Sequence, residues 1–290
     1  MMLMLGTAFA EEATLIPGRT LRVSFAPASF GFQVQKWDWE GVSNEKVFAL
    51  GMGLGLEYGP SGWINFQLLW FPGINVFSSI PGGKYGLMTD MFLGTKIGIL
   101  GKGALVESEK LRFSLSPGMK MPLGGFNASG KANTLREPDQ HLWGSALRLY
   151  FDYIASPWFF VNTYLEGIFY PLQWSYNPLF KTNLVNHFLD ITTEVKMHFQ
   201  FALKKGIVLK TGIPLTFFAA PMMNSRDSNA KDSQLCFGSG LYFGMVFPKL
   251  IDFTIRYHAP IVGKNTEPVH RIDLLFGFTI PLFRQETVHD

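Results

Sequence analysis

Charged and polar side chains recur at alternate positions between residues 187 and 201. Asp190, Glu194, Lys196 and His198 bring carboxylate, ammonium and imidazole groups to one parity of this stretch. Such groups can move a proton, or attract or repel a charged solute, depending on what faces them. The intervening positions are nearly all apolar: Leu189, Ile191, Thr193, Val195, Met197, Phe199 and Phe201. The groups able to do chemistry therefore share one face, and the opposite face is suited to an apolar environment.

Catalytic and metal sites are weakly indicated. Hydrolysis needs a nucleophile beside a base that a third group orients. Neither His198 nor His258 has a Ser or Cys that the sequence pattern places within reach. The other histidines are scattered without ligand spacing: His141, His187, His270 and His289. The glycines of GMGLGL alternate within an apolar stretch and precede no helix, unlike a phosphate loop. We therefore predict no metal, no cofactor and no enzyme activity.

The elements that position these groups follow from the period of two, which is that of a β-strand. The pattern returns along the whole chain, in residues 21–34, 47–58, 64–70, 87–99, 111–116, 147–153, 158–170, 187–201, 207–213, 237–247, 251–258 and 271–280. These make about twelve strands of roughly ten residues, long enough to cross a bilayer when tilted, with ten or fourteen as alternatives. In the first strand the apolar parity slips beside Pro27, which predicts a bulge there.

Composition limits the possible classes. Only 16% of the 290 residues are charged and 15% are aromatic, whereas soluble proteins carry about 25% charged residues. No apolar run is long enough for a membrane-spanning helix. The net charge of +3 and the absence of a Lys/Arg-rich block argue against nucleic acid. Cys236 is the only cysteine, which excludes an internal disulfide and suggests a small buried strand residue.

The first ten residues, MMLMLGTAFA, end in the small-x-small pattern Ala8-Phe9-Ala10 that precedes signal-peptide cleavage. We predict a signal peptide over residues 1–10 and a single barrel domain over residues 11–290. The usual basic n-region is missing, so either the true start lies upstream or these residues are a disordered end.

The predicted connections alternate in length. Tight turns at residues 59–62, 155–158, 203–206 and 247–250, with a longer one at 101–110, alternate with long links near 35–46, 72–85, 124–142, 172–186, 220–234 and 260–270. Aromatic residues gather where strands meet connections, as in the two girdles of a membrane barrel: Trp37, Trp39, Trp63, Trp70, Trp143, Trp158, Tyr170 and Trp174.

With these features the chain resembles the outer-membrane β-barrel proteins of diderm bacteria over nearly all its length after the leader. The match is architectural, and its end, RIDLLFGFTIPLF, approaches their terminal aromatic with Phe283, although a polar tail follows. The resemblance implies an all-β, transmembrane, antiparallel up-and-down barrel in the outer membrane. It further implies extracellular long links, periplasmic termini, a lipid bilayer around the barrel and the barrel-assembly machinery as a partner during insertion.

The polar face would then line a lumen, because a soluble barrel puts its apolar face inside and a wide apolar interior would need filling. Glycines on the polar face, such as Gly94, Gly238 and Gly244, would leave no costly gap in a wet lumen. The predicted pore-lining residues are Arg22, Asp90, Lys96, Arg112, Arg148, Asp152, Asp190, Glu194, Lys196, His198, Lys210, Asp252, Arg256, Arg271 and Asp273.

The signs of these charges nearly balance, so we expect a narrow, weakly selective channel for small polar solutes. The alternative is a plugged structural or adhesive barrel, because twelve strands lie between the filled eight-stranded barrels and the open sixteen-stranded ones. A hydrolase acting on lipid is a third, less favoured alternative that the resemblance brings with it. The oligomeric state stays open.

Overall fold

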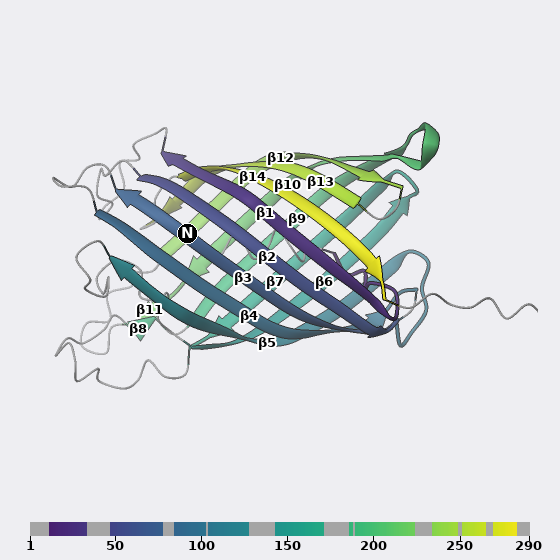
Figure 1. The fold of residues 1–290 in the computed structure, drawn as a ribbon, viewed down its shortest axis with the longest axis horizontal. Coiled ribbons are helices and arrows are strands. Elements are labelled where there is room, and N and C mark those ends of the chain that lie inside the picture. The colour runs from purple at the N-terminus through teal and green to yellow at the C-terminus, as the bar shows by residue number, and fades with distance from the viewer. Residues whose placement is uncertain are drawn as a thin grey trace, which may run out of the picture.

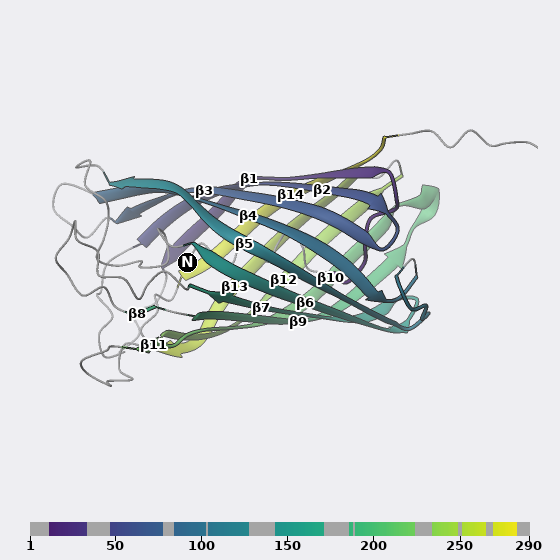
Figure 2. The same ribbon diagram turned by 90° about the horizontal axis from the view of Figure 1, so that it is seen from below.

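The chain forms one closed antiparallel barrel of twelve strands, in which each barrel strand pairs with the next barrel strand in sequence (Figure 1). The computed structural model describes residues 12–33, 47–77, 84–102, 104–127, 143–170, 186–187, 189–223, 234–248, 251–264 and 269–282. The strands run obliquely to the long axis, as closure of a sheet requires (Figure 2). The predicted up-and-down barrel of about twelve strands is confirmed. No helix in the described ranges is long and apolar enough to cross a membrane.

The barrel strands are β1 (Thr20–Gln33), β2 (Val47–Ser61), β3 (Ile64–Phe77), β4 (Lys84–Leu100), β5 (Leu111–Asn127), β6 (Gly144–Ser156), β7 (Phe159–Phe169), β9 (Leu189–Ala202), β10 (Val208–Ala220), β12 (Gln234–Phe247), β13 (Ile251–Lys264) and β14 (Val269–Pro281). Two further strands, β8 (Asn186–His187) and β11 (Met222–Met223), pair only with each other. His187 thus lies outside the strand to which the sequence pattern assigned it.

Closure is made by β1, which pairs with β14 on one side and β2 on the other. Its register with β14 shifts between Phe25 and Ala28, and its register with β2 shifts between Ala26 and Ser29. Proline has no N–H to give to the ladder, so the two shifts fall around Pro27. The predicted bulge is confirmed.

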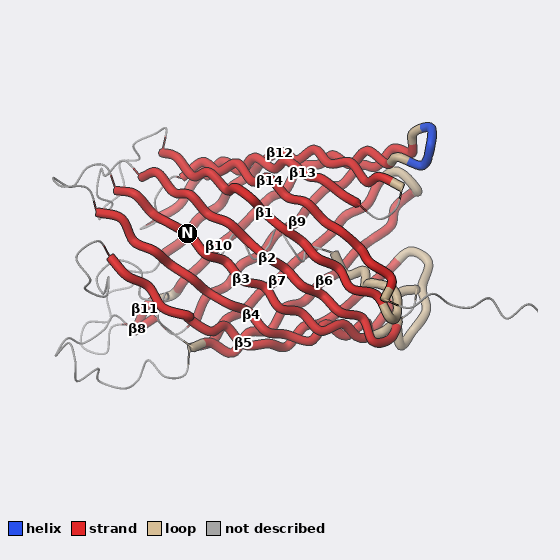
Figure 3. The backbone as a smooth tube through the Cα atoms, viewed as in Figure 1, coloured by secondary structure: helices blue, strands red, loops and turns tan. Residues whose placement is uncertain are grey.

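The two ends of the barrel differ. All the tight turns, the start of β1 and the end of β14 lie at one end, which we call the short-turn end (Figure 3). At the other end three predicted long links are shorter than expected, because β3 continues to Phe77, β5 to Asn127 and β13 to Lys264. Pro260, which falls in one of these predicted links, lies inside β13, where a register shift between Phe237 and Gly238 accommodates it.

The two faces of each strand follow the predicted alternation. In β9 every second side chain from Asp190 to His198 is buried, and in β6 buried residues alternate with exposed or half-buried ones. Large apolar residues point outward, with Leu241 60% exposed, while Glu194 on the inner face is 2% exposed. A soluble barrel would show the reverse, so the outer surface is suited to lipid.

The predicted aromatic girdles are partly wrong. Trp63 and Trp158 are exposed beside short turns, and Trp143 is exposed at the opposite end, as expected. Trp70, however, lies in the middle of β3, and Tyr170 is buried on the inside. Three residues of the predicted girdles lie outside the described residues: Trp37, Trp39 and Trp174.

Candidate functional site

The inner wall is organised by side chains that reach over glycines. His198 on β9, Gly212 on β10 and Tyr242 on β12 lie side by side in register. The Tyr242 hydroxyl hydrogen-bonds His198 Nδ1 across Gly212, and the rings stack at 5.7 Å. A Cβ on Gly212 would come within 2.6 Å of the Tyr242 ring. Because Gly212 has no side chain, the side chains of β9 and β12, which are not adjacent strands, can contact each other above β10.

The same arrangement recurs around the barrel. Arg22 on β1 donates to Asp252 on β13 at 2.9 Å, over Gly277 of the intervening β14. A Cβ on Gly277 would lie 2.4 Å from the Asp252 carboxylate. Glycines on the polar face were expected to leave room for water. At Gly94 and Gly238 that expectation is wrong, because an added Cβ would lie 2.6 Å from the Phe92 ring and 2.4 Å from the His258 ring.

Three buried ion pairs lie on the lumen wall. Arg148 pairs with Glu166 on the neighbouring strand, and Arg271 Nε donates to Asp273 at 2.7 Å. The third, Arg256 with Glu194, joins β13 to β9 over the two strands between them. Ser29 supports the second pair by donating to Asp273 and accepting from Arg271. Charges compensated in this way contribute little net field to the lumen.

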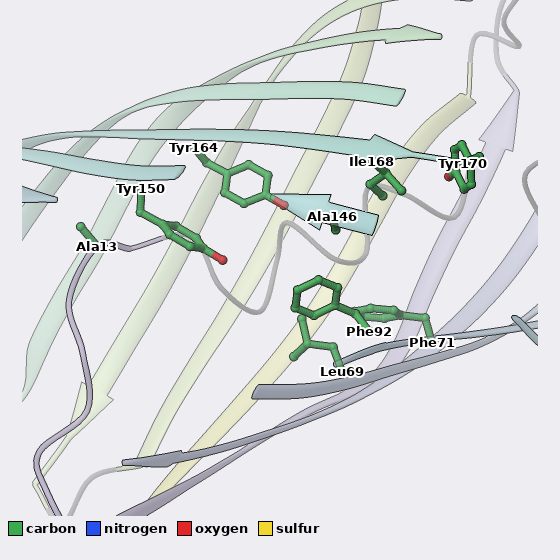
Figure 4. Close-up of a cluster of buried hydrophobic side chains, with 9 residues drawn as sticks. All are labelled: Ala13, Leu69, Phe71, Phe92, Ala146, Tyr150, Tyr164, Ile168 and Tyr170. Carbon is green, nitrogen blue, oxygen red and sulfur yellow. The ribbon is translucent and has the colours of Figure 1, made fainter. Parts of the chain in front are cut away.

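One side of the lumen, formed by β3, β4, β6 and β7, is filled by an apolar cluster (Figure 4). The cluster consists of Ala13, Leu69, Phe71, Phe92, Ala146, Tyr150, Tyr164, Ile168 and Tyr170. Cations cap its rings: the Arg148 guanidinium lies 3.4 Å from the Phe92 centroid, and Lys96 Nζ lies 4.5 Å from that of Tyr150. Such contacts stabilise a charge that has lost water. This side is closed by packing.

Residues 12–19, which we call the lumen segment, precede β1 and enter the barrel from the short-turn end (Figure 1). Ala13 is buried beside Tyr150 in the apolar cluster, and its N–H donates to Asp152 at 2.9 Å. Lys96 Nζ donates to the carbonyl oxygens of Glu12 and Thr14, the latter at 3.0 Å. The segment is therefore held by specific hydrogen bonds to the inner wall.

Two further cations bind the side chains of this segment. Arg112 donates to the Thr14 hydroxyl at 2.8 Å, and Lys210 Nζ lies 3.6 Å from the Glu12 carboxylate. The attraction of Lys210, and then of Lys196, lowers the pKa of the Glu12 carboxyl. Glu12 is therefore ionised at neutral pH.

A cavity of about 1140 Å³ lies beside the lumen segment, mainly against β9, β10, β12, β13, β14 and β1. It reaches the short-turn end at Arg19 and Pro281 and extends inward to Lys196 and Arg256. The barrel thus has a packed side, formed by the apolar cluster, and a hollow, charged side that opens at the short-turn end.

The predicted site residues fall into three groups. Arg22, Lys96, Lys196, His198, Lys210, Asp252 and Arg256 line the cavity, whereas Arg112 and Asp152 bind the lumen segment beside it. Arg148, Asp190, Glu194, Arg271 and Asp273 lie deeper in the lumen wall, where Asp190 accepts from the Tyr170 hydroxyl at 2.6 Å. The backbone of Asp90 is in β4, but its side chain lies outside the described residues.

The histidines do not form a recognisable catalytic group. His198 bonds Tyr242, and His258 Nε2 hydrogen-bonds the Thr216 hydroxyl at 2.5 Å. This threonine lies 42 residues away from His258, and no spacing in the sequence pointed to it. Among the described residues, no three or more His, Cys, Asp or Glu side chains are placed to hold a metal ion.

Several important lumen residues were missed at the level of sequence. Phe92, Tyr150, Tyr164 and Tyr242 all occupy inward positions of their strands. Each is an aromatic residue at a position where the alternation of its strand otherwise places a polar or small residue. This exception to the pattern was the feature that could have identified them. The lumen segment carried no comparable signal, because it contains no alternation and no strand.

Comparisons with known proteins agree on the fold. No protein-family model matches the chain, and a search of curated proteins found no match. The crystal structure of the COG4313 outer membrane channel from Pseudomonas putida F1 is similar, with 13% identity, a TM-score of 0.66, and coverage of 94% of this chain and 98% of that one.

The β domain of the Bordetella autotransporter BrkA is also similar, with 10% identity, a TM-score of 0.50, and coverage of 91% of this chain and 99% of that one. At these identities the likeness establishes the fold and not the activity. The chain therefore has the fold of the bacterial outer-membrane β-barrels.

Proposed function

We propose that this chain is an integral outer-membrane barrel with its long links at the cell surface and its short turns and both termini in the periplasm. The apolar outer surface supports burial in lipid, and the shared end of the short turns, the start of β1 and the end of β14 supports the orientation. The bilayer is its lasting partner, and the barrel-assembly machinery acts during insertion.

Cysteine labelling of whole cells tests this orientation. A Ser61→Cys variant, at a short turn, should not react with an impermeant maleimide. A Ser129→Cys variant, in a long link outside the described residues, should react. Lysed cells provide the control that both cysteines are reactive. Equal labelling of the two variants in intact cells would contradict the orientation.

Within that membrane we propose a narrow channel for small polar solutes. The observation that carries the proposal is the charged cavity of about 1140 Å³, which occupies the side of the lumen that the apolar cluster leaves unfilled. Buried polar atoms such as Thr192 Oγ1 and Ser114 Oγ have no hydrogen-bond partner among the described residues. Such atoms cost free energy unless solvated, which favours a hydrated lumen.

Weak selectivity between simple ions is expected because many charges of the lumen wall are paired. Arg256 and Glu194 compensate each other, as do Arg148 and Glu166, so these pairs add little field, and the preference comes from the remaining charges of the cavity. Conductance of refolded protein in planar bilayers tests this: we expect small steps and, in a salt gradient, a reversal potential displaced only slightly towards anions. A Lys196→Glu variant should shift the preference towards cations. Folded protein without any conductance would contradict the channel.

The second candidate is a plugged structural or adhesive barrel. It is favoured by the lumen segment, which binds inside the barrel through Ala13, Thr14 and Glu12. Under this hypothesis the segment is a permanent part of the wall, and removing it opens no path. The hydrogen bonds of Tyr242 to His198 and of Thr216 to His258 give no reason to propose an enzyme.

A further inference from the structure

The cavity beside the lumen segment is rich in positive charge. Six Lys and Arg side chains line it, against three carboxylates: Arg19, Arg22, Lys96, Lys196, Lys210 and Arg256 against Glu12, Glu57 and Asp252. One of these acids, Glu12, belongs to the lumen segment rather than to the barrel strands. Without it the excess of cations grows. A concave site lined mainly by one sign of charge concentrates ions of the other sign.

The cations of the cavity differ in their partners. Arg22 is paired with Asp252, and Arg256 with Glu194, so both guanidinium groups have carboxylates supplied by barrel strands. Lys210 is different, because its ion pair is with Glu12. If the lumen segment withdraws, the Lys210 ammonium keeps no carboxylate partner among the described residues. Lys96 loses the two carbonyl oxygens of Glu12 and Thr14 at the same time.

The contact of Glu12 with Lys210 shows that this part of the cavity binds a carboxylate group. Its carboxylate lies against Lys210, and Lys196 and His198 line the same cavity. The pair is not fully buried, since the side chains of Lys210 and Glu12 keep 28% and 43% of their exposure. An ion pair with this much solvent contact is weak, so a carboxylate from solution can compete with it.

We propose that Lys210, with Lys196 and Lys96, forms a binding site for the carboxylate group of a small anionic solute, and that Glu12 occupies this site as an internal competitor. The inference rests on the proposed channel in so far as the solute reaches the site through the lumen. A bound solute and the docked lumen segment exclude each other. Binding of the anionic solute therefore favours release of the lumen segment, which narrows the path of the solute through the barrel.

Equilibrium dialysis of the detergent-solubilised barrel with radiolabelled succinate tests the site without requiring any conductance. The Glu12→Gln variant should bind succinate about two- to fivefold more tightly than the wild type, which corresponds to the strength of a partly exposed ion pair. The Lys210→Gln variant should bind it roughly tenfold more weakly, because a charge-assisted contact is lost. Lys204→Gln, in the exposed turn between β9 and β10, removes the same charge outside the cavity and should bind like the wild type.

Two controls make the outcome decisive. Succinamide has the size of succinate without its charge and should not compete with it. Heat-modifiability on a gel reports whether each variant is folded, and Glu12→Gln changes no barrel strand. Equal succinate affinity of the wild type and Glu12→Gln would overturn the role of Glu12 as a competitor. Wild-type succinate affinity in Lys210→Gln would overturn the binding site itself. A barrel that binds succinate without conducting would refute the channel and leave the site standing.

Discussion

An arginine on the outer face of β12 should be far more costly than one on the inner face. Leu241 is 60% exposed and lies in the middle of this 14-residue strand, where the surrounding lipid is most apolar. An arginine near the bilayer midplane costs roughly 2 to 4 kcal/mol in an outer-membrane barrel. Leu241→Arg should therefore lower the ratio of folded to unfolded protein in lipid by roughly 30- to 700-fold.

The matched control is Thr254→Arg on the neighbouring strand β13. Thr254 lines the cavity, which has room for the longer side chain and carries Asp252 as a carboxylate nearby. This variant should cost less than about 1 kcal/mol, as lumen-facing substitutions are tolerated. Urea-dependent folding into lipid vesicles, followed by heat-modifiability on a gel, measures both values. The assignment of faces is refuted if Thr254→Arg is the more damaging of the two.

Two further predictions address the inner wall. Gly212→Ala should destabilise the barrel by about 1 to 3 kcal/mol, because the added methyl meets backbone and ring atoms, whereas Gly167→Ala should be near neutral because nothing lies within 4 Å of its added Cβ. Equal urea midpoints for the two variants would count against bridging over glycine. Arg256→Met should cost about 3 to 5 kcal/mol by removing the guanidinium that pairs with the buried Glu194 carboxylate, and adding Glu194→Gln should restore much of that loss. Additive costs in this double-mutant cycle would show that the pair is not coupled.

The barrel itself could be predicted from sequence because its environment imposes one rule on every strand. Lipid on one side and a polar lumen on the other force an alternation that survives in β9 and β12, and even the slip beside Pro27 was visible as a change of parity. Strand ends were less accurate. The link predicted at 260–270 is shorter, because β13 continues through Pro260 with a register shift.

The interior could not be predicted to the same extent, because its contacts join strands that are distant in sequence. Alternation shows that His198 faces inward, but not that Tyr242 reaches it over Gly212. The docking of Glu12 on Lys210 depends on closure of the barrel around the lumen segment. A linear pattern identifies the polar face and does not show which parts of it are filled.

Single-channel conductance of a variant that lacks residues 12–18 tests the central claim most directly. The lumen segment lies inside the short-turn end beside the cavity, so its removal should widen the path there. We predict conductance steps clearly larger than those of the wild type in the same salt, from protein that is folded by heat-modifiability. Folded variant protein that stays silent, or conducts no more than the wild type, would contradict an aqueous path through this barrel that the segment narrows.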